Sequence, residues 1–258
     1  MNTINRLQEF AARLFFLAMA FAYPCVSFAQ LNVIVSGGFR AAYQRATPEY
    51  ERVNGIKLVT TYGASQGNSA TAIIPMIHRG VAADVVIMGL EGLEELIAEG
   101  KIVAGTEVNL AETPTGVGVR TGAPLPDIGT VESFKRTLLQ AKSVAFPSST
   151  TGIFVVNKLF PRLGIAEEMK SKSSTLGAVA VARGEVEIAI RPESEIRGVE
   201  GVTYVGPIPA DVQFLSIFSG AVVKGAKDVE GAKRLLAYLA SEKTEPAIRS
   251  AGMVKSKH

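Results

Sequence analysis

The sequence predicts an α/β protein with two lobes arranged as a clamshell, each lobe a mostly parallel sheet with flanking helices. From residue 31 onward, short β-branched runs alternate with longer stretches of helical periodicity, a pattern typical of parallel sheets covered by helices. Two stretches interrupt this alternation, residues 109–115, where Pro114 would break any helix, and residues 201–209. We expect the chain to cross between the two lobes at these stretches.

The first half of the chain alternates strand and helix. The expected strands cover residues 31–35, 57–62 and 83–88, and the expected helices cover residues 41–54, 69–79 and 90–99. Gly55 and Gly100 follow two of these helices, where glycine commonly ends a helix.

The second half continues the same alternation. The expected strands cover residues 117–120, 143–146, 187–191 and 214–223, and the expected helices cover residues 133–140, 152–163, 176–183, 229–240 and 245–251. The order of these elements divides the chain into a leader at residues 1–29, a first lobe at 30–112, a second lobe at 113–206 and a return part of the first lobe at 207–258.

The leader has the features of a secretory signal peptide. Arg6 and Arg13 precede an apolar stretch at residues 14–23, and the small residues of Ser27-Phe28-Ala29 end the segment. The apolar stretch is well short of the roughly 20 residues that span a bilayer, which argues against the alternative of a membrane anchor. We therefore expect export to the periplasm with cleavage after Ala29.

Composition narrows the range of partners. Cleavage removes two arginines and one glutamate, which leaves 25 basic and 23 acidic side chains and gives no sign of nucleic-acid binding. The single cysteine, Cys25, leaves with the leader, so no disulfide is expected, and the two histidines, His78 and His258, are far apart in the sequence. No transition-metal site and no cofactor are predicted. We expect a monomer that binds a small molecule.

Three apolar runs each stop at a turn of glycine and small hydroxyl residues, and a helical segment follows each turn. The turns are Ser36-Gly37-Gly38, Gly63-Ala64-Ser65 and Ser148 to Gly152. A helix start carries free backbone N–H groups and the positive end of the helix dipole, so each turn is a candidate anion site. The alternative for any one turn is ordinary capping of the helix by serine or threonine.

The positions of the three turns favour a shared cleft. In open α/β sheets the ligand lies at the carboxyl ends of the strands, and all three turns follow strands. Two turns belong to the first lobe and the third to the second lobe. We therefore expect them to close on one ligand from opposite sides.

The segment Gly80 to Ile87, which reads GVAADVVI, resembles the G-x-P/A-A-D-V motif of the periplasmic solute-binding proteins that serve ABC transporters, in their molybdate-binding branch. Further matches in order and spacing lie at residues 31–38, 62–65, 151–154 and 182–185. The resemblance covers Leu31 to about Met253 and implies the type II periplasmic binding protein clamshell.

The resemblance also implies which residues bind the ligand. In that family, neutral hydroxyls and backbone N–H groups hold an oxyanion, and a helix start in the second lobe contributes to the same site. Carried over by position, the implied ligand-binding residues are Ser36, Gly37, Ala64, Ser65, Thr151 and Gly177.

Two arginines depart from the family pattern. Arg191 stands where the molybdate-binding branch has a tyrosine, and Arg40 follows the first turn, where that branch is typically uncharged. A tetrahedral oxyanion held by neutral dipoles needs no arginine, whereas a guanidinium matches a planar carboxylate through two hydrogen bonds. We therefore expect a carboxylate ligand that contacts both arginines. The alternative is that Arg191 pairs with Glu193 or Glu195 and does not meet the ligand.

Two functions fit these expectations. In the first, the chain captures a small anion, an oxyanion or a carboxylate, and delivers it to an ABC permease. In the second, the chain interconverts trans- and cis-aconitate, because the resemblance extends to a periplasmic aconitate isomerase on the same scaffold. That reaction needs a base, and the sequence does not identify the catalytic residues, although Glu193 and Glu195 lie near Arg191. Asp84 is expected to cap backbone groups.

Overall fold

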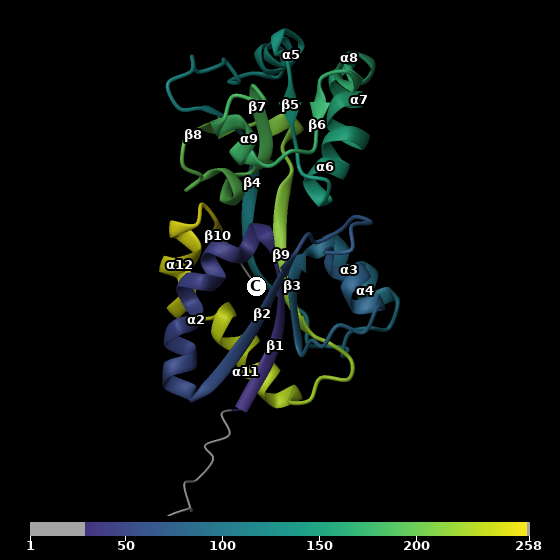
Figure 1. Ribbon diagram of the computed structural model, residues 1–258, viewed down its shortest axis with the longest axis vertical. Helices are drawn as coiled ribbons and strands as arrows, with labels where there is room; N and C mark the ends of the chain where they lie inside the picture. Colours follow the sequence, from purple (N-terminus) through teal and green to yellow (C-terminus); the bar gives the residue numbers. More distant parts are fainter. Residues whose placement is uncertain (1–28, 257–258) are drawn as a thin grey trace, which may run out of the picture.

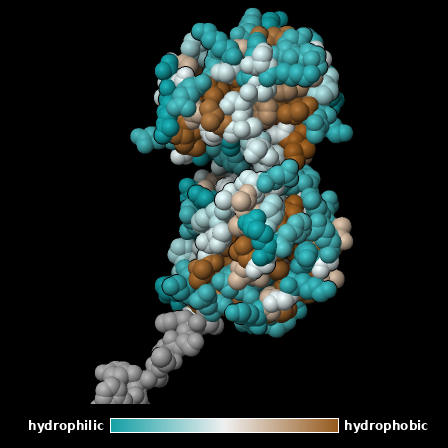
Figure 2. Space-filling model, turned by 45° about the vertical axis from the view of Figure 1, so that its right-hand side comes forward, coloured by the Kyte–Doolittle hydropathy of each residue, from teal (hydrophilic) through white to brown (hydrophobic). Residues whose placement is uncertain are grey.

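Two α/β lobes lie on either side of a narrow waist, through which strands β4 (Val108–Arg120) and β9 (Leu215–Val222) run (Figure 1). The computed structural model of the chain describes residues 29–256, so residues 1–28 of the leader and His258 lie outside the described part. No helix in that range is long and apolar enough to cross a membrane. Figure 2 shows the waist as a constriction between the two lobes.

The first lobe combines elements from both ends of the chain. Besides β9 and the first part of β4, these elements are β1 (Ala29–Ser36), η1 (Gly37–Phe39), α2 (Arg40–Asn54), β2 (Ile56–Gly63), α3 (Ile73–His78), β3 (Val85–Gly89), α4 (Leu90–Ala98), α11 (Val229–Ala240), η4 (Glu242–Thr244), α12 (Glu245–Ser250) and β10 (Val254–Lys255). Successive side chains of β1 alternate between the two faces of the sheet. Val33 packs in the core beneath α2, α11 and α12, whereas Ile34 packs in the core beneath α3 and α4.

The sheet of the first lobe is mixed. Strand β1 pairs in parallel with β2 and β3, whereas β9 pairs antiparallel with β3 and β4, and β10 pairs antiparallel with β4. Because β1, β2 and β3 run in the same direction, their carboxyl ends at Ser36, Gly63 and Gly89 lie at one edge of the sheet. Ser36 is in register with Gly63, so the first two hydroxyl turns are neighbours.

The second lobe has the same layered construction. Besides the second part of β4, its elements are α5 (Val131–Gln140), β5 (Val144–Ala145), α6 (Thr150–Phe154), η2 (Val155–Leu159), α7 (Phe160–Leu163), α8 (Ala166–Lys170), β6 (Ser173–Ser174), α9 (Ala178–Ala182), β7 (Ile188–Pro192), α10 (Glu193–Ile196), β8 (Val202–Pro207) and η3 (Ala210–Val212). Strand β5 pairs in parallel with β6 and β7, whereas β4 pairs antiparallel with β7 and β8. Its main core includes Phe134, Val144 and Ile188, all nearly inaccessible to solvent.

The two expected crossings differ from the prediction in detail. Residues 109–115 belong to β4, which is continuous, and Pro114 is the last residue paired with β9 while Thr115 is the first paired with β7. Proline has no N–H to donate, so it fits the point at which the strand leaves one sheet for the next. Residues 201–209 include β8, and the chain returns to the first lobe after η3. The lobe boundaries at residues 112 and 206 stay a prediction.

Candidate functional site

A cavity of about 540 Å³ lies between the two lobes. A smaller inner cavity adjoins it and shares three lining residues with it, Ser36, Ser149 and Glu195. All eight residues expected at the ligand line one or both of these cavities. The larger, outer cavity is lined by Ser36, Gly37, Arg40, Ala64, Gly177 and Arg191. The inner cavity is lined by Ser36, Ser65 and Thr151. The three turns therefore come together as expected, and their contact with a ligand stays a prediction.

The first turn is held tightly against the sheet. A Cβ atom at Gly38 would lie only 2.4 Å from the ring of Phe218, so this position accepts glycine alone. Ser36 precedes the short helix η1 but makes no side-chain capping hydrogen bond. The Ser36 hydroxyl is therefore not used as a helix cap.

The first two turns are joined by a chain of hydrogen bonds. The backbone N–H of Gly89 donates to Ser65 Oγ over 2.8 Å, and the Ser65 hydroxyl donates to Ser36 Oγ over 2.9 Å. Both serines are only 4% exposed, and the chain leaves the hydroxyl hydrogen of Ser36 as its last donor. Successive hydrogen bonds polarise one another, which strengthens that last donor. The first lobe thus presents a neutral but oriented hydroxyl to the cavity.

The third turn is equally constrained. A Cβ atom at Gly152 would lie 1.6 Å from the carbonyl oxygen of Pro147, so only glycine permits this turn. Ser149 occupies the N-cap position of α6 without a side-chain capping bond, and Thr151 Oγ1 lies 3.4 Å from Ser216 Oγ. The hydroxyls of the third turn, like that of Ser36, are not used to cap the helix.

The second and third turns touch across the cleft. Thr150 Oγ1 donates to Gln66 Oε1 over 2.9 Å, which joins the second lobe to the first. A Cβ atom at Gly67 would lie 3.0 Å from the carbonyl oxygen of Ser148. The two lobes are therefore in contact across the cleft at these turns.

Arg191 is the main cation of the second lobe in the cleft. Its side chain is 11% exposed, and Nη1 donates to Glu195 Oε2 over 2.6 Å while Nη2 donates to the carbonyl oxygen of Leu176 over 3.2 Å. Its Nε is buried without a hydrogen-bond partner. The ion pair with Glu195 is one of the two pairings that the sequence analysis offered as an alternative to ligand binding. The guanidinium nevertheless lies at the cavity wall.

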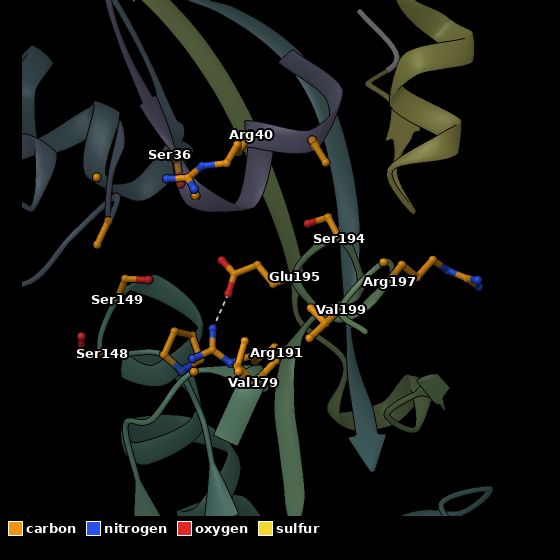
Figure 3. Close-up of a pocket in the computed structure, with 18 of the residues that line it drawn as sticks. Ser36, Arg40, Ser148, Ser149, Val179, Arg191, Ser194, Glu195, Arg197 and Val199 are labelled. Atoms are coloured by element: carbon orange, nitrogen blue, oxygen red, sulfur yellow. Dashed lines mark hydrogen bonds and ion pairs between the residues drawn. The ribbon is translucent and has the colours of Figure 1, made fainter. Parts of the chain in front are cut away.

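Arg40 faces Arg191 from the first lobe (Figure 3). Its guanidinium lies 4.0 Å from the centre of the Tyr62 ring, and its side chain is exposed to the cavity. Two cations thus approach the cavity from opposite lobes, with the carboxylate of Glu195 between them in Figure 3.

The two glutamates suggested as bases have different surroundings. Glu193 pairs with Arg197 and accepts a hydrogen bond of 2.8 Å from Tyr204 Oη, and it does not line either cavity. Burial, together with the hydrogen bond to Glu193, raises the pKa of Tyr204. Glu195 lines both cavities, and its Oε1 lies 3.2 Å from the position of a Cβ on Gly38. Of the two glutamates, only Glu195 reaches the cleft.

Two polar residues of the site were missed by sequence analysis. Glu91, in the first turn of α4, lines the inner cavity, and its Oε2 is buried without a hydrogen-bond partner. Burial raises the pKa of this carboxyl group. Ser194 lines the outer cavity, and its Oγ is also buried without a partner. An acidic residue in a first helical turn commonly complements the helix dipole at the surface, so the pattern around Glu91 gave no sign of a site.

Asp84 and His78 have structural roles. Asp84 is 2% exposed and accepts hydrogen bonds of 2.8 Å from the backbone N–H groups of Asn32 and Lys227, as the capping hypothesis predicts. His78 lies 2.5 Å from a carboxylate oxygen of Glu99. Within residues 29–256, no group of three or more histidine, cysteine, aspartate and glutamate side chains is placed to hold a metal ion.

The architecture and the cleft define the class of protein. Two α/β lobes joined at a waist, with helix starts facing a cavity between them, are the features of the periplasmic binding protein fold. Residues 31–254 match the family described as bacterial extracellular solute-binding protein. The chain belongs to this family.

Three similar proteins are informative. An aconitate isomerase from a Pseudomonas species is 35% identical over 227 residues, which cover 86% of this chain and 87% of that protein. The molybdate-binding protein ModA of Azotobacter vinelandii is 22% identical over 236 residues, 87% of this chain and 89% of that protein. The solved structure of the periplasmic molybdate-binding protein of Azotobacter vinelandii superposes with a TM-score of 0.71 at 15% identity, covering 88% of this chain and all of the other. The structural likeness supports the fold.

Proposed function

We propose that the chain binds a small polycarboxylate between its lobes and interconverts the isomers of aconitate. The observation that carries this proposal is Arg191, a guanidinium at the cavity wall with Arg40 opposite it. A buried arginine needs a planar acceptor, and a carboxylate provides one through two hydrogen bonds. An aconitate carries three carboxylates, which two arginines and the hydroxyl turns can share.

The 35% identity with an aconitate isomerase supports the reaction. Moving the double bond requires a base that takes a proton from the allylic carbon and donors that stabilise the negative charge spreading onto the carboxylates. The Ser36 hydroxyl, oriented by Ser65, is a donor already in place before the ligand arrives, and Arg191 Nε is a buried donor without a partner. Donors that need no reorganisation stabilise developing charge most effectively.

A second candidate is capture of a small anion and its delivery to an ABC permease. The neutral hydroxyls at Ser36, Ser65 and Thr151 favour it, because such groups suit an oxyanion as well as a carboxylate. Family membership supports it too, since solute-binding proteins release their ligand when the lobes open. Both candidates require an anion bound in the same cleft.

Proton NMR of trans-aconitate with the purified protein distinguishes the two candidates. We expect the signals of cis-aconitate to grow with time in proportion to protein concentration, and a heat-denatured sample to leave the substrate unchanged. Line broadening without conversion would favour delivery to a permease. A thermal-shift screen of molybdate, tungstate, sulfate and small di- and tricarboxylates then ranks the ligands, because a ligand that binds only the folded state raises the melting temperature.

The last part of the proposal concerns the location of the mature chain. We place the mature chain in the periplasm as a monomer, starting at Gln30 after removal of the leader, because the leader has the basic start and small-residue end of a signal peptide. The intact mass of protein recovered from the periplasm should equal that of a chain that starts at Gln30. A full-length species retained in membranes would contradict this placement.

A further inference from the structure

The inner cavity is lined by a carboxyl group, that of Glu91, for which the structure shows no ion pair with a described residue and a hydrogen bond from its own backbone N–H at the start of α4. Glu91 projects from the first turn of α4, which follows β3 directly. The α4 start is pressed against the second hydroxyl turn, since a Cβ atom at Gly92 would lie 3.0 Å from the Ser65 carbonyl oxygen. Glu91 therefore lines the inner cavity together with Ser36 and Ser65, with its Oε2 buried and unpartnered.

The size of the two cavities suggests how a ligand would reach Glu91. The inner cavity holds only about 20 Å³, enough for one small group, whereas the outer cavity holds about 540 Å³. Because the two share Ser36, Ser149 and Glu195, a ligand in the outer cavity can extend one carbon into the inner one. Glu195 lines the same space, but its carboxylate is committed to Arg191.

We propose that Glu91 is the catalytic acid and base that moves the proton during isomerisation, an inference that rests on the proposed function. The Glu91 carboxylate takes a proton from the methylene carbon of aconitate, and the electron pair of that C–H bond forms the new double bond. The electron pair of the old double bond moves to the far carbon of the three-carbon unit, stabilised by its carboxylate. The Glu91 carboxylic acid then returns the proton to that far carbon, so no proton is gained or lost overall.

The electrostatics of the inner cavity suit this role. Burial is the main cause of the raised pKa of Glu91, the nearby charge of Glu94 raises it further, and a hydrogen bond from the residue's own backbone N–H opposes them. A raised pKa makes the carboxylate a stronger base, which favours a group that takes a proton from carbon and returns it. The charged side chains that line the inner cavity, within the described residues, are Glu91 and Glu195.

The test uses Glu91→Gln with Glu132→Gln as the matched control, because Glu132 holds the same place in the first turn of α5 but is exposed and lines neither cavity. Proton NMR in deuterium oxide follows both conversion of trans-aconitate and exchange of its methylene protons, and calorimetry measures its affinity. We expect Glu91→Gln to lower conversion and exchange roughly 10²- to 10⁴-fold, the usual contribution of a positioned proton-transfer group, with affinity changed by less than about tenfold. Glu132→Gln should match the wild type in all three measurements.

The outcomes separate this inference from the proposed function. If the wild type converts aconitate and Glu91→Gln converts it equally well, the role of Glu91 is wrong while the isomerase function stands. If the wild type binds aconitate without conversion or exchange, the isomerase function fails and the role of Glu91 fails with it. Loss of affinity in parallel with the rate in Glu91→Gln would assign the residue to binding and overturn the catalytic role.

Discussion

The two sides of the cleft present their polar groups in different ways. On the first lobe, neutral hydroxyls are fixed by a hydrogen-bond chain that starts at the backbone of Gly89. On the second lobe, a charged pair of Arg191 and Glu195 lines the cavity, and Arg191 Nε has no partner. The hydroxyl chain of the first lobe is uncharged and ends in the free hydroxyl hydrogen of Ser36, whereas the unmet donor of the second lobe belongs to a guanidinium. We call the hydroxyl chain the neutral side and the Arg191–Glu195 pair the charged side; Arg40 and Glu91 of the first lobe stand apart from the hydroxyl chain. We expect the neutral side to set the geometry of the bound ligand and the charged side to select it.

The largest expected effect tests the charged side. Arg191→Ala should weaken binding of a carboxylate ligand by well over tenfold, because truncating one partner of a buried charged pair typically costs about 2 to 5 kcal/mol. Arg191→Lys should not restore affinity, since lysine lacks the planar fork. Calorimetry measures both variants, with Arg183→Ala as a control whose side chain is largely exposed and lines neither cavity. Tight molybdate binding that survives Arg191→Ala would show that the neutral side alone selects the ligand.

The next effect tests the neutral side. Ser36→Ala and Thr151→Ala should each weaken binding by about 1 kcal/mol, the usual net contribution of a hydrogen bond, and by more where the acceptor is charged. Thr151→Ser keeps the hydroxyl and should retain affinity. Ser250→Ala, on the exposed surface of α12, serves as the control for loss of a hydroxyl. Unchanged affinity in both alanine variants would mean that the turns serve only the fold.

A smaller effect tests whether Glu195 competes with the ligand for Arg191. Glu195→Gln removes a negative charge from the cavity wall, so a polycarboxylate should bind a few-fold more tightly, an effect of about 1 kcal/mol or less. Glu193→Gln is the matched control, because Glu193 lies on the same short helix but lines neither cavity. Weaker binding by Glu195→Gln would show instead that Glu195 holds Arg191 in its binding position.

The smallest effect concerns stability and pH. The pKa of Glu91 is raised in the folded protein, so its contribution to stability is present below its ordinary pKa and is lost as pH rises through the folded value. Glu91→Gln cannot ionise and should melt slightly above the wild type at pH 8, with the difference shrinking toward pH 4. The shift should be a few degrees at most, since about 1 kcal/mol moves the midpoint of a chain of this size by only about 2–4 °C. An equal shift at both pH values would contradict the raised pKa.

The three hydroxyl turns could be predicted from the sequence, whereas the positions of the charged side chains in the cleft between them could not. A strand that ends in glycine and serine places its last residues at one sheet edge, so Ser36, Ser65 and Thr151 could be expected to meet. The pairing of Arg191 with Glu195 could only be offered as one alternative, since it depends on where α10 turns after β7. Glu91 is an ordinary helix-start acid in the sequence, and the inner cavity that it lines is built from residues of both lobes, which no local pattern encodes.

The crossings between the lobes could also be predicted only in part from the sequence. Pro114 was expected to interrupt regular structure, and a proline inside a central strand is normally unfavourable because a ladder hydrogen bond is lost. Here the residue is the last one that β4 pairs with β9, and the next residue, Thr115, begins the pairing with β7. The periodicity of a sequence predicts which residues form a strand, but it does not show that one continuous strand pairs in two sheets.

The continuous strand β4 has a consequence for affinity. A strand that belongs to both sheets, with β9 beside it, restricts the lobes to a narrow set of relative orientations. When a ligand binds between Arg191 and Ser36, the two lobes therefore lose little entropy of relative motion, because the backbone has already limited their relative orientations. Part of the binding free energy is in this way determined by β4, a strand that lines neither cavity, and lengthening the chain between Thr113 and Thr115 should weaken binding without removing one ligand contact.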